Sequence, residues 1–359
     1  MSGKINLVWP LTVYPLAGYS DQGLVDLAVW QTAAGPAYVR ALQERATPAI
    51  DATYLLEAGT QDTAEVMAII EWVRRGRNVW IADPVARVYE DLYLGAGDGV
   101  RTTFAVPVLA AGYSGLTVYV DGDPAAPKHA VVANLLATDG EAKAEWSSGY
   151  LTAARGTGST DAERIYLPGS AEAAQVTDPT AASSYVLSRP YYSPGSGTPT
   201  LPYAVEGETL SMVAVLTPHA TNAVQGQLVF KDSTGGYIGG IFPVVLAAAP
   251  GQWQILSGNG VVGTGAVEVL VGGEIGNAET GEVTVAALAL APGDLKEWWL
   301  PSRAPVAVEL SIAPAAGAAV TARVTGQRLY QVVAAREPDV RLDSAGNRTV
   351  RISWQGVRP

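Results

Sequence analysis

The sequence contains no cysteine and only two histidines, and this shortage removes several kinds of chemistry. Without cysteine there are no disulfides, no thiolate nucleophiles and no cysteine-ligated metals. His129 and His219 are far apart and stand in loop-like contexts beside Lys128 and Pro218, so we expect solvent-exposed or capping histidines. The zinc-protease, nucleophile-elbow and P-loop motifs are absent from the sequence as well. We therefore predict that the chain is not an enzyme and holds no catalytic, metal or cofactor site.

Charged residues and long apolar runs are also scarce. Only 16% of residues are charged, against roughly 25% in an average soluble domain. The net charge of −11 gives a field that repels phosphate backbones and anionic lipid, which argues against nucleic-acid partners. The longest apolar run, Ile241–Ala249, is too short to span a bilayer. Ile5–Ala17 has the apolar character of an export signal, but Pro10 and Pro15 interrupt it and an edge strand fits at least as well.

Glycine and proline are plentiful, and they indicate a β-rich chain. There are 39 glycines and 23 prolines, while 48% of residues are hydrophobic. This combination is typical of many short strands joined by tight turns. A length of 359 residues suits about two or three domains, each with its own core. We predict a mainly β fold, with an α+β N-terminal domain that contains one amphipathic helix.

That helix belongs to the most clearly patterned stretch of the chain. Ala49–Leu56 reads as a strand, and Asp62 with Glu65 forms a capping-box pattern that begins a helix. The helix has apolar residues at helical spacing, namely Val66, Ile69, Ile70 and Val73. Gly76 supplies the left-handed residue that ends it, and Val79–Ala82 is the next strand.

The same stretch carries a family resemblance. The residues are Arg74–Arg77, the aromatic strand around Trp80, Asp83-Pro84, Gly97–Gly99 and Thr102–Phe104, followed by the hairpin-like Val118–Gly122. This series resembles the distal-tail and minor tail proteins of long-tailed bacteriophages. The resemblance implies a virion protein, assembled in the host cytoplasm, that forms a homo-oligomeric ring, a hexamer in the family. Its partners would be further copies of itself, the tail tube and the proteins of the tail tip and hub.

A second resemblance covers the middle of the chain, about residues 130–292. The positions that carry it are Asn134–Leu136, Trp146, Glu206–Ser211, Phe230–Gly235, Gly251–Trp253 and Gly272-Gly273. Their order resembles the jelly-roll carbohydrate-binding modules of glycosidases and phage tail proteins. The resemblance implies a β-sandwich and a host-surface glycan as a partner. Such modules often hold a structural calcium, although no calcium-loop motif is present here.

The last strands of the chain define the domain organisation that we predict. Four alternating segments follow the middle region: Val306–Ile312, Thr321–Thr325, Tyr330–Val333 and Thr349–Trp354. If they rejoin the first domain, residues 1–128 are completed by 296–359, and residues 129–293 are an inserted jelly roll. Asp123–Pro127 is then a linker.

Near the N-terminus we expect strands at Asn6–Tyr14 and Gly23–Trp30, with a turn at Gly18–Asp21 between them. Ala37–Glu44 is interpreted as a helical or extended connection.

Candidate binding residues are aromatic. Tyr191, Tyr192 and Tyr237 lie in or next to predicted loops and would form a platform for a sugar, although loop anchoring explains them more simply. Trp298 and Trp299 stand between predicted domains and either cover the edge of a core or form a subunit or domain interface.

Two enzyme-like patterns have simpler readings. Gly258–Gly263 matches a dinucleotide-binding motif, but the alternating Ala266–Val271 after it predicts a strand and not the required helix, so we interpret the match as a jelly-roll loop. A glycosidase needs two carboxylates at catalytic separation. The candidates, Glu206, Glu208, Asp232 and Glu268, all stand where turn or surface roles suffice.

The sequence thus favours a structural protein of a phage tail tip or baseplate, forming a ring between tail tube and tip and displaying a glycan-binding module. Two alternatives stay open. One is a receptor-binding or side-fibre protein, and the other is a secreted bacterial glycan-binding protein.

Overall fold

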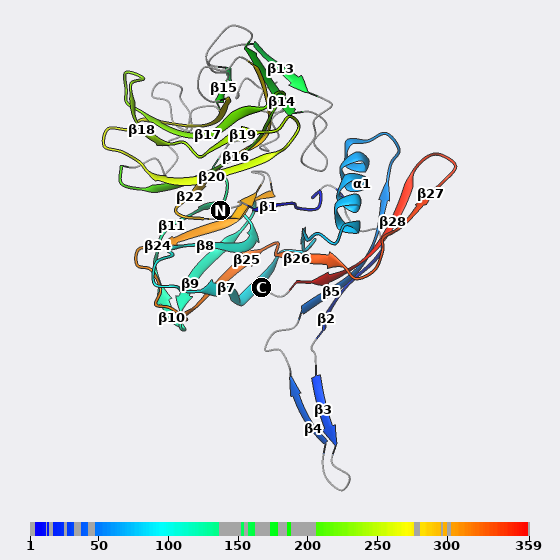
Figure 1. The fold of residues 1–359 in the computed structure, drawn as a ribbon. Coiled ribbons are helices and arrows are strands. Elements are labelled where there is room, and N and C mark those ends of the chain that lie inside the picture. The colour runs from blue at the N-terminus through cyan, green and yellow to red at the C-terminus, as the bar shows by residue number, and fades with distance from the viewer. Residues whose placement is uncertain are drawn as a thin grey trace. The chain divides into compact units, whose positions relative to one another are not determined.

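The computed structural model describes residues 4–11, 13, 17–24, 27–31, 37–41, 47–135, 152–153, 157–161, 173–178, 185–187, 206–275, 281–295, 297–299 and 303–357. Within these ranges α1 (Gln61–Arg74) is the one helix and the other regular elements are strands, which confirms a mainly β fold (Figure 1). No helix in this part of the chain has the length and apolar character needed to cross a membrane.

The chain forms two compact units, each made of two segments. Unit 1 comprises Met1–Asn6 and Val85–Gln327, and unit 2 comprises Leu7–Pro84 and Arg328–Pro359. The predicted domains, residues 1–128 completed by 296–359 and an insertion of 129–293, have other boundaries than these two units. That division stays a prediction.

Unit 2 contains a sheet with α1 against it (Figure 1). Its strands, in spatial order, are β2 (Ala17–Leu24), β5 (Thr47–Leu56), β28 (Arg348–Gly356), β26 (Leu329–Ala334) and β6 (Val79–Ala82), with β27 (Asp339–Leu342) also paired to β28. The apolar stripe of α1 is buried as predicted, with Val66 and Ile70 fully inaccessible. Aromatic packing adds to the core, since the Trp9 ring centroid lies 4.7 Å from that of Tyr54 and 5.6 Å from that of Trp354.

The start of α1 differs from the predicted capping box. Thr60 is the N-cap, with an extended backbone (φ −83°, ψ 154°), and its hydroxyl accepts from the Thr63 amide at 3.2 Å. Asp62 lies inside the first helical turn, where its charge favours the positive end of the helix dipole. The prediction that Asp62 begins the helix was therefore wrong by two residues. Gly76 ends the helix with φ 72°, as predicted.

The N-terminal strand predictions need correction too. Among the described residues of the strand predicted at Asn6–Tyr14, only Asn6 lies in a strand, β1 (Lys4–Asn6), and Pro10, which lacks an amide donor, interrupts the pattern. The turn predicted at Gly18–Asp21 lies inside β2, because pairing with β5 overrides turn propensity. The register shift between Ala17 and Ser20 falls on these turn-prone residues.

The strand predicted at Gly23–Trp30 is divided between β2 and β3 (Leu27–Gln31). In the described residues β3 pairs only with β4 (Ala37–Ala41). The described part of Ala37–Glu44, for which helical and extended conformations were both open, is therefore extended.

Unit 1 includes two small sheets over a shared core. One has the order β10-β9-β25-β7 and the other β11-β24-β8. Their bounds are β7 (Arg87–Ala96), β8 (Thr103–Leu109), β9 (Ser114–Val120), β10 (Asp123–Ala125), β11 (Pro127–Val132), β24 (Pro305–Leu310) and β25 (Ala319–Gly326). Phe104, Val106, Val306 and Val320, all fully buried, belong to that core.

A tight hairpin replaces the predicted linker in this region. Asp121 and Gly122 have φ 50° and 89°, which is the backbone of a two-residue hairpin turn, and Asp123 pairs with Val120. Residues 123–125 therefore form β10, and the linker interpretation of Asp123–Pro127 was wrong. Sequence reasoning also missed β7, whose charged residues hide its alternation.

The rest of unit 1 is the predicted β-sandwich. The first sheet contains β12 (Thr152–Ala153), β15 (Tyr185–Leu187), β21 (Glu268–Ile275), β17 (Asn222–Lys231), β18 (Tyr237–Ile241) and β19 (Val244–Ala248). The second contains β13 (Thr157–Asp161), β14 (Ala173–Asp178), β22 (Gly281–Pro292), β16 (Thr209–Pro218) and β20 (Gln254–Val261). Leu228 and Phe230 from the first sheet share one core with Met212 and Leu290 from the second. Short β1 pairs with β23 (Glu297–Trp299).

The dinucleotide-like motif lies mostly in a strand of this sandwich. Gly258 and Gly260 belong to β20 and pair with Met212 and Leu210, so the interpretation of Gly258–Gly263 as a loop was wrong for Gly258–Val261. A Cβ at Gly258 would lie 2.7 Å from Cδ1 of Ile241, so the terminal methyl of Ile241 would have to shift to make room for a side chain there. As predicted, a strand, β21, follows the motif.

Candidate functional site

Strand alternation gives the first sheet of the sandwich an outer face that carries several polar side chains. On β17, Leu228 and Phe230 point into the core, so Gln227, Val229 and Lys231 lie on the opposite side. On β21, Val269 and Val271 are in the core, which places Glu274 on that same opposite side. We call this side, on strands β21, β17, β18 and β19, the outer face.

A polar pair forms the floor of the outer face. Nε2 of Gln227 donates a hydrogen bond to Oε2 of Glu274. Gln227 is only 7% exposed, although its neighbours along the face are partly accessible. Gly272 stands directly opposite Gln227 in the β17–β21 register, so no side chain occupies that position. The pair is thus a fixed set of hydrogen-bonding groups.

Two aromatic rings flank this floor at the β18 edge. Tyr237 is 60% exposed and Phe242 40%, and their ring centroids are 6.2 Å apart with planes tilted by 42°. Tyr237 is paired in register with Lys231 of the outer face. A Cβ at Gly240 would lie 3.2 Å from Cζ of Phe242. The absence of a side chain at Gly240 therefore leaves room for the Phe242 ring next to the strand. Exposed rings beside a few fixed polar groups can stack on and orient a ligand.

Of the three tyrosines in the predicted platform, the structure describes Tyr237. Tyr191 and Tyr192 lie outside the described residues, while Tyr237 is exposed on the outer face. Sequence reasoning missed Phe242, although it is one of only three phenylalanines and directly precedes a proline between two strands, a position that favours exposure.

Trp298 and Trp299 are buried inside unit 1. They are 3% and 2% exposed, and Nδ2 of Asn134 donates to the Trp299 carbonyl at 2.7 Å. The role of both side chains in an interface stays a prediction.

Both histidines have carboxylate neighbours. Nδ1 of His219 lies 2.5 Å from Oε2 of Glu282, and its Nε2 lies 2.6 Å from Oγ1 of Thr284. Nε2 of His129 lies 3.5 Å from Oε1 of Glu208. Their side chains are 14% and 22% exposed, so the expectation of solvent-exposed histidines was wrong. Contacts with these neighbouring side chains explain their positions.

The carboxylates considered for glycosidase chemistry have structural partners. Glu206 accepts from the Thr264 hydroxyl at 2.6 Å, and Oε1 of Glu208 lies 2.5 Å from Nζ of Lys128. The hydroxyl of Thr234 and nearby backbone amides hold the pKa of Asp232 below its usual range. Glu268 stands opposite Lys231 in the β17–β21 register. Across the described ranges, no group of three His, Asp or Glu residues is arranged to hold a metal ion.

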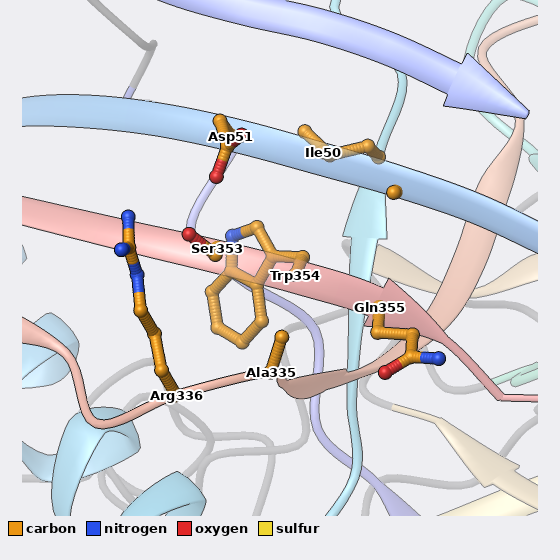
Figure 2. Close-up of a pocket in the computed structure, with 8 residues that line it drawn as sticks. Ile50, Asp51, Ala335, Arg336, Ser353, Trp354 and Gln355 are labelled. Carbon is orange, nitrogen blue, oxygen red and sulfur yellow. The ribbon is translucent and has the colours of Figure 1, made fainter. Parts of the chain in front are cut away.

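Unit 2 has a separate open hollow of about 380 Å³. It is lined by Ala49, Ile50 and Asp51 of β5, by Ser353, Trp354 and Gln355 of β28, and by Ala335 and Arg336. Figure 2 shows the side chains of Asp51 and Ser353, which are paired in register, with Trp354 and Arg336 beside them. Burial raises the pKa of the nearby core residue Tyr54 to about 12, so that hydroxyl stays protonated. Because Trp354 is only 1% exposed, the hollow offers little aromatic surface, and the outer face is the stronger candidate site.

Neither a protein-family model nor a curated protein matches the sequence. Among solved structures, the enzymatically active domain of tailspike protein 4 of bacteriophage CBA120 is similar over 45% of this chain and 21% of that one, with 12% identity and a TM-score of 0.34. The C-terminal family 22 carbohydrate-binding module of Clostridium thermocellum Xyn10B is similar over 47% of this chain and 94% of that one, with 16% identity and a TM-score of 0.32. The CBM22-1 xylan-binding domain of Paenibacillus barcinonensis Xyn10C is similar over 48% of this chain and 97% of that one, with 11% identity and a TM-score of 0.31. With TM-scores this low, the site has to be argued from its own geometry.

Proposed function

We propose that this protein binds a glycan on the outer face of its β-sandwich. The observation that carries the proposal is the exposed ring pair of Tyr237 and Phe242 beside the hydrogen-bonded Gln227 and Glu274. The C–H face of a sugar ring is apolar enough to stack on an aromatic ring, and its hydroxyls need fixed polar partners for orientation. The outer face provides both kinds of group within one rigid sheet.

The proposal is tested by comparing the wild-type protein with Tyr237→Ala and Phe242→Ala on a glycan array, followed by calorimetric titration. We expect each substitution to weaken binding about tenfold, since an aromatic contact is worth about 1 kcal/mol or more beyond its buried area. Ile312→Ala is the matched control, because Ile312 is 82% exposed in a loop outside the sandwich. Unchanged affinity in both aromatic variants, with folding intact, would refute this site.

We further infer that the protein acts as a structural part of a phage tail tip or baseplate, without enzyme activity. In this proposal the protein forms a ring, a hexamer, between the tail tube and the tip proteins, and displays the glycan-binding sandwich outward as part of the virion. The similarity of Glu44–Gly122 to distal-tail and minor tail proteins supports it. A structural observation supports assembly as well: the β3–β4 sheet has two strands and ten residues, of which only Arg40 is charged. In the part of the chain that the structure describes, this sheet has no third strand. A two-stranded sheet by itself is marginally stable in water, so contact with another chain would stabilise it.

The ring proposal is tested by light scattering across protein concentration, with negative-stain images of any large species. A matched variant replaces the β3–β4 segment by joining Leu24 to Thr47 through Asn-Gly. These two residues are the terminal pair of the β2–β5 ladder, so a two-residue turn closes it. We expect closed rings from the wild-type protein and smaller species from the variant. If the wild-type protein and the variant form rings equally well, the β3–β4 segment has no role in assembly. If both proteins are monomers, the receptor-binding, side-fibre or secreted alternatives are favoured.

A further inference from the structure

The chain from Tyr237 to Pro250, which includes β18 and β19, is almost entirely apolar. The hydroxyl of Tyr237 is the one side-chain group in this segment that can form a hydrogen bond. Val245 packs against the sandwich core, so strand alternation places Val244 and Leu246 on the outer face. Val244 is 47% exposed and Leu246 76%. We call these two residues the aliphatic strip, and it continues the outer face beyond the ring pair.

One side-chain amide lies next to the aliphatic strip. Gln225 stands directly opposite Val244 in the β17–β19 register, so the two side chains share one side of the sheet with Cβ atoms about 5 Å apart. Gln225 is partly exposed, and within the described residues its side chain makes no hydrogen bond. A glutamine amide has an acceptor oxygen and two donor hydrogens. Gln225 can therefore both donate to and accept from a ligand that lies over the strip.

An acetamido group on a sugar matches this combination of an amide and an aliphatic surface. Its carbonyl accepts a hydrogen bond, its N–H donates one, and its methyl is apolar. Burying the methyl against aliphatic side chains is favourable, whereas a hexose hydroxyl in the same place would lose water without a side-chain partner on β19. An O-acetyl ester has the methyl and the carbonyl but lacks the N–H donor, so it matches only in part.

Building on the proposed glycan-binding function, we propose that the outer face selects glycans that contain N-acetylhexosamine. Gln225 binds the acetamido group through its amide, and Val244 and Leu246 contact the methyl. The rings of Tyr237 and Phe242 stack on the sugar itself, which is common to acetylated and plain hexoses. The rings therefore set the affinity, and Gln225 with the aliphatic strip sets the specificity.

The test uses a glycan array that presents each N-acetylhexosamine oligosaccharide together with the plain hexose and the O-acetylated hexose of the same linkage. The intact wild-type protein should bind the N-acetyl members roughly tenfold more tightly than the plain members, since both an amide contact and methyl burial are gained. The O-acetylated members should fall between the two, because they lack the N–H donor.

Two variants remove the two parts of the acetamido contact. Gln225→Met keeps the length of the side chain but removes its hydrogen-bonding groups, and it should bring N-acetyl and O-acetyl affinities within about threefold of one another. Leu246→Ala should reduce the preference for both acetylated classes over plain hexose. Because Leu246 is 76% exposed, this variant should fold as the wild type does.

Two further variants are matched controls. Val261→Ala shortens another exposed aliphatic residue, 60% exposed at the end of β20 in the second sheet, and should leave the preference unchanged. Tyr237→Ala should weaken binding of all three classes alike, because stacking does not depend on the acetyl group.

The outcomes separate this inference from the function on which it rests. Equal wild-type affinity for N-acetyl and plain members overturns the inference while glycan binding stands, and so does a preference that persists in both Gln225→Met and Leu246→Ala. Light scattering that shows self-association lost in Leu246→Ala would make the strip an interface between copies and would also overturn the inference. Wild-type protein that binds no glycan overturns the proposed function and this inference with it.

Discussion

At the scale of single residues, three aspartates hold three turns in the same way. Oδ1 of Asp98 accepts from the amides of Arg101 at 2.6 Å and Val100 at 2.8 Å. Asp232 accepts from the hydroxyl and amide of Thr234, and Asp343 from the side chain and amide of Asn347. In each case hydrogen bonds to the charged form hold the pKa of the carboxyl below its usual range.

These turns predict an acid sensitivity with a defined sign. A carboxyl whose pKa is lower in the folded state contributes stability that is fully present above its unfolded pKa of about 3.9 and is lost as pH falls through the folded pKa. Asp98→Asn, Asp232→Asn and Asp343→Asn should therefore lower stability at pH 7 and flatten its decline below about pH 4. Urea unfolding across pH measures this. At a pH below both pKa values the variants should approach the wild type, and a difference that stays constant across pH would contradict the account.

The candidate site shows which residue-level features a sequence reveals. Tyr237 was predictable because an aromatic residue directly after a glycine turn tends to be exposed. The pairing of Gln227 with Glu274 was not, because the two are 47 positions apart and meet only through the register of β17 and β21. Similarly, His219 meets Glu282 through β16 and β22, and no local pattern indicates it.

At the scale of elements, the sequence predicted the end of a strand correctly where the covalent structure of a residue, such as the ring of proline, stops the strand. The bounds of β6, Val79–Ala82, match the prediction, since Asp83-Pro84 ends the strand. Local rules failed at β2 and β10, where turn-prone residues are held in strands by β5 and β9. Pairing between distant segments contributes hydrogen bonds that outweigh the local turn propensity. The periodicity of the sequence does not reveal which distant segments pair.

The start of α1 provides a direct test at this scale. Thr60→Ala should destabilise unit 2 by about 1 kcal/mol, because the Thr63 amide loses its acceptor. Thr60→Ser, which retains the hydroxyl, should cost much less. Asp62→Ala should cost about 0.5 kcal/mol through the helix dipole alone. Chemical denaturation measures all three, and a larger loss for Asp62→Ala than for Thr60→Ala would restore Asp62 as the cap.

At the scale of the whole molecule, late strands complete sheets begun by early ones. β28 pairs with β5, and β24 pairs with β8, so segments almost 300 residues apart in sequence meet in unit 2 and about 200 apart in unit 1. Each unit also has its own core, with Trp354 at 1% exposure in unit 2 and Phe104 at 0% in unit 1.

Separate cores predict separate unfolding. Trp354→Ala and Phe104→Ala each remove a large buried ring, which should cost about 3–5 kcal/mol. By differential scanning calorimetry we expect the two variants to lower different transitions, because each substitution affects only the unit that contains it. A single transition lowered equally by both would show that the units unfold as one.

The most direct measurement of the central claim is amide hydrogen exchange of the whole protein, with and without the glycan that binds best on the array. The account predicts slower exchange in β17, β18 and β21 around Gln227, Tyr237 and Glu274, and no such change in the Tyr237→Ala variant at the same glycan concentration. Protection confined to the unit 2 hollow around Asp51 and Arg336, or to the second sheet of the sandwich, would contradict binding at the outer face.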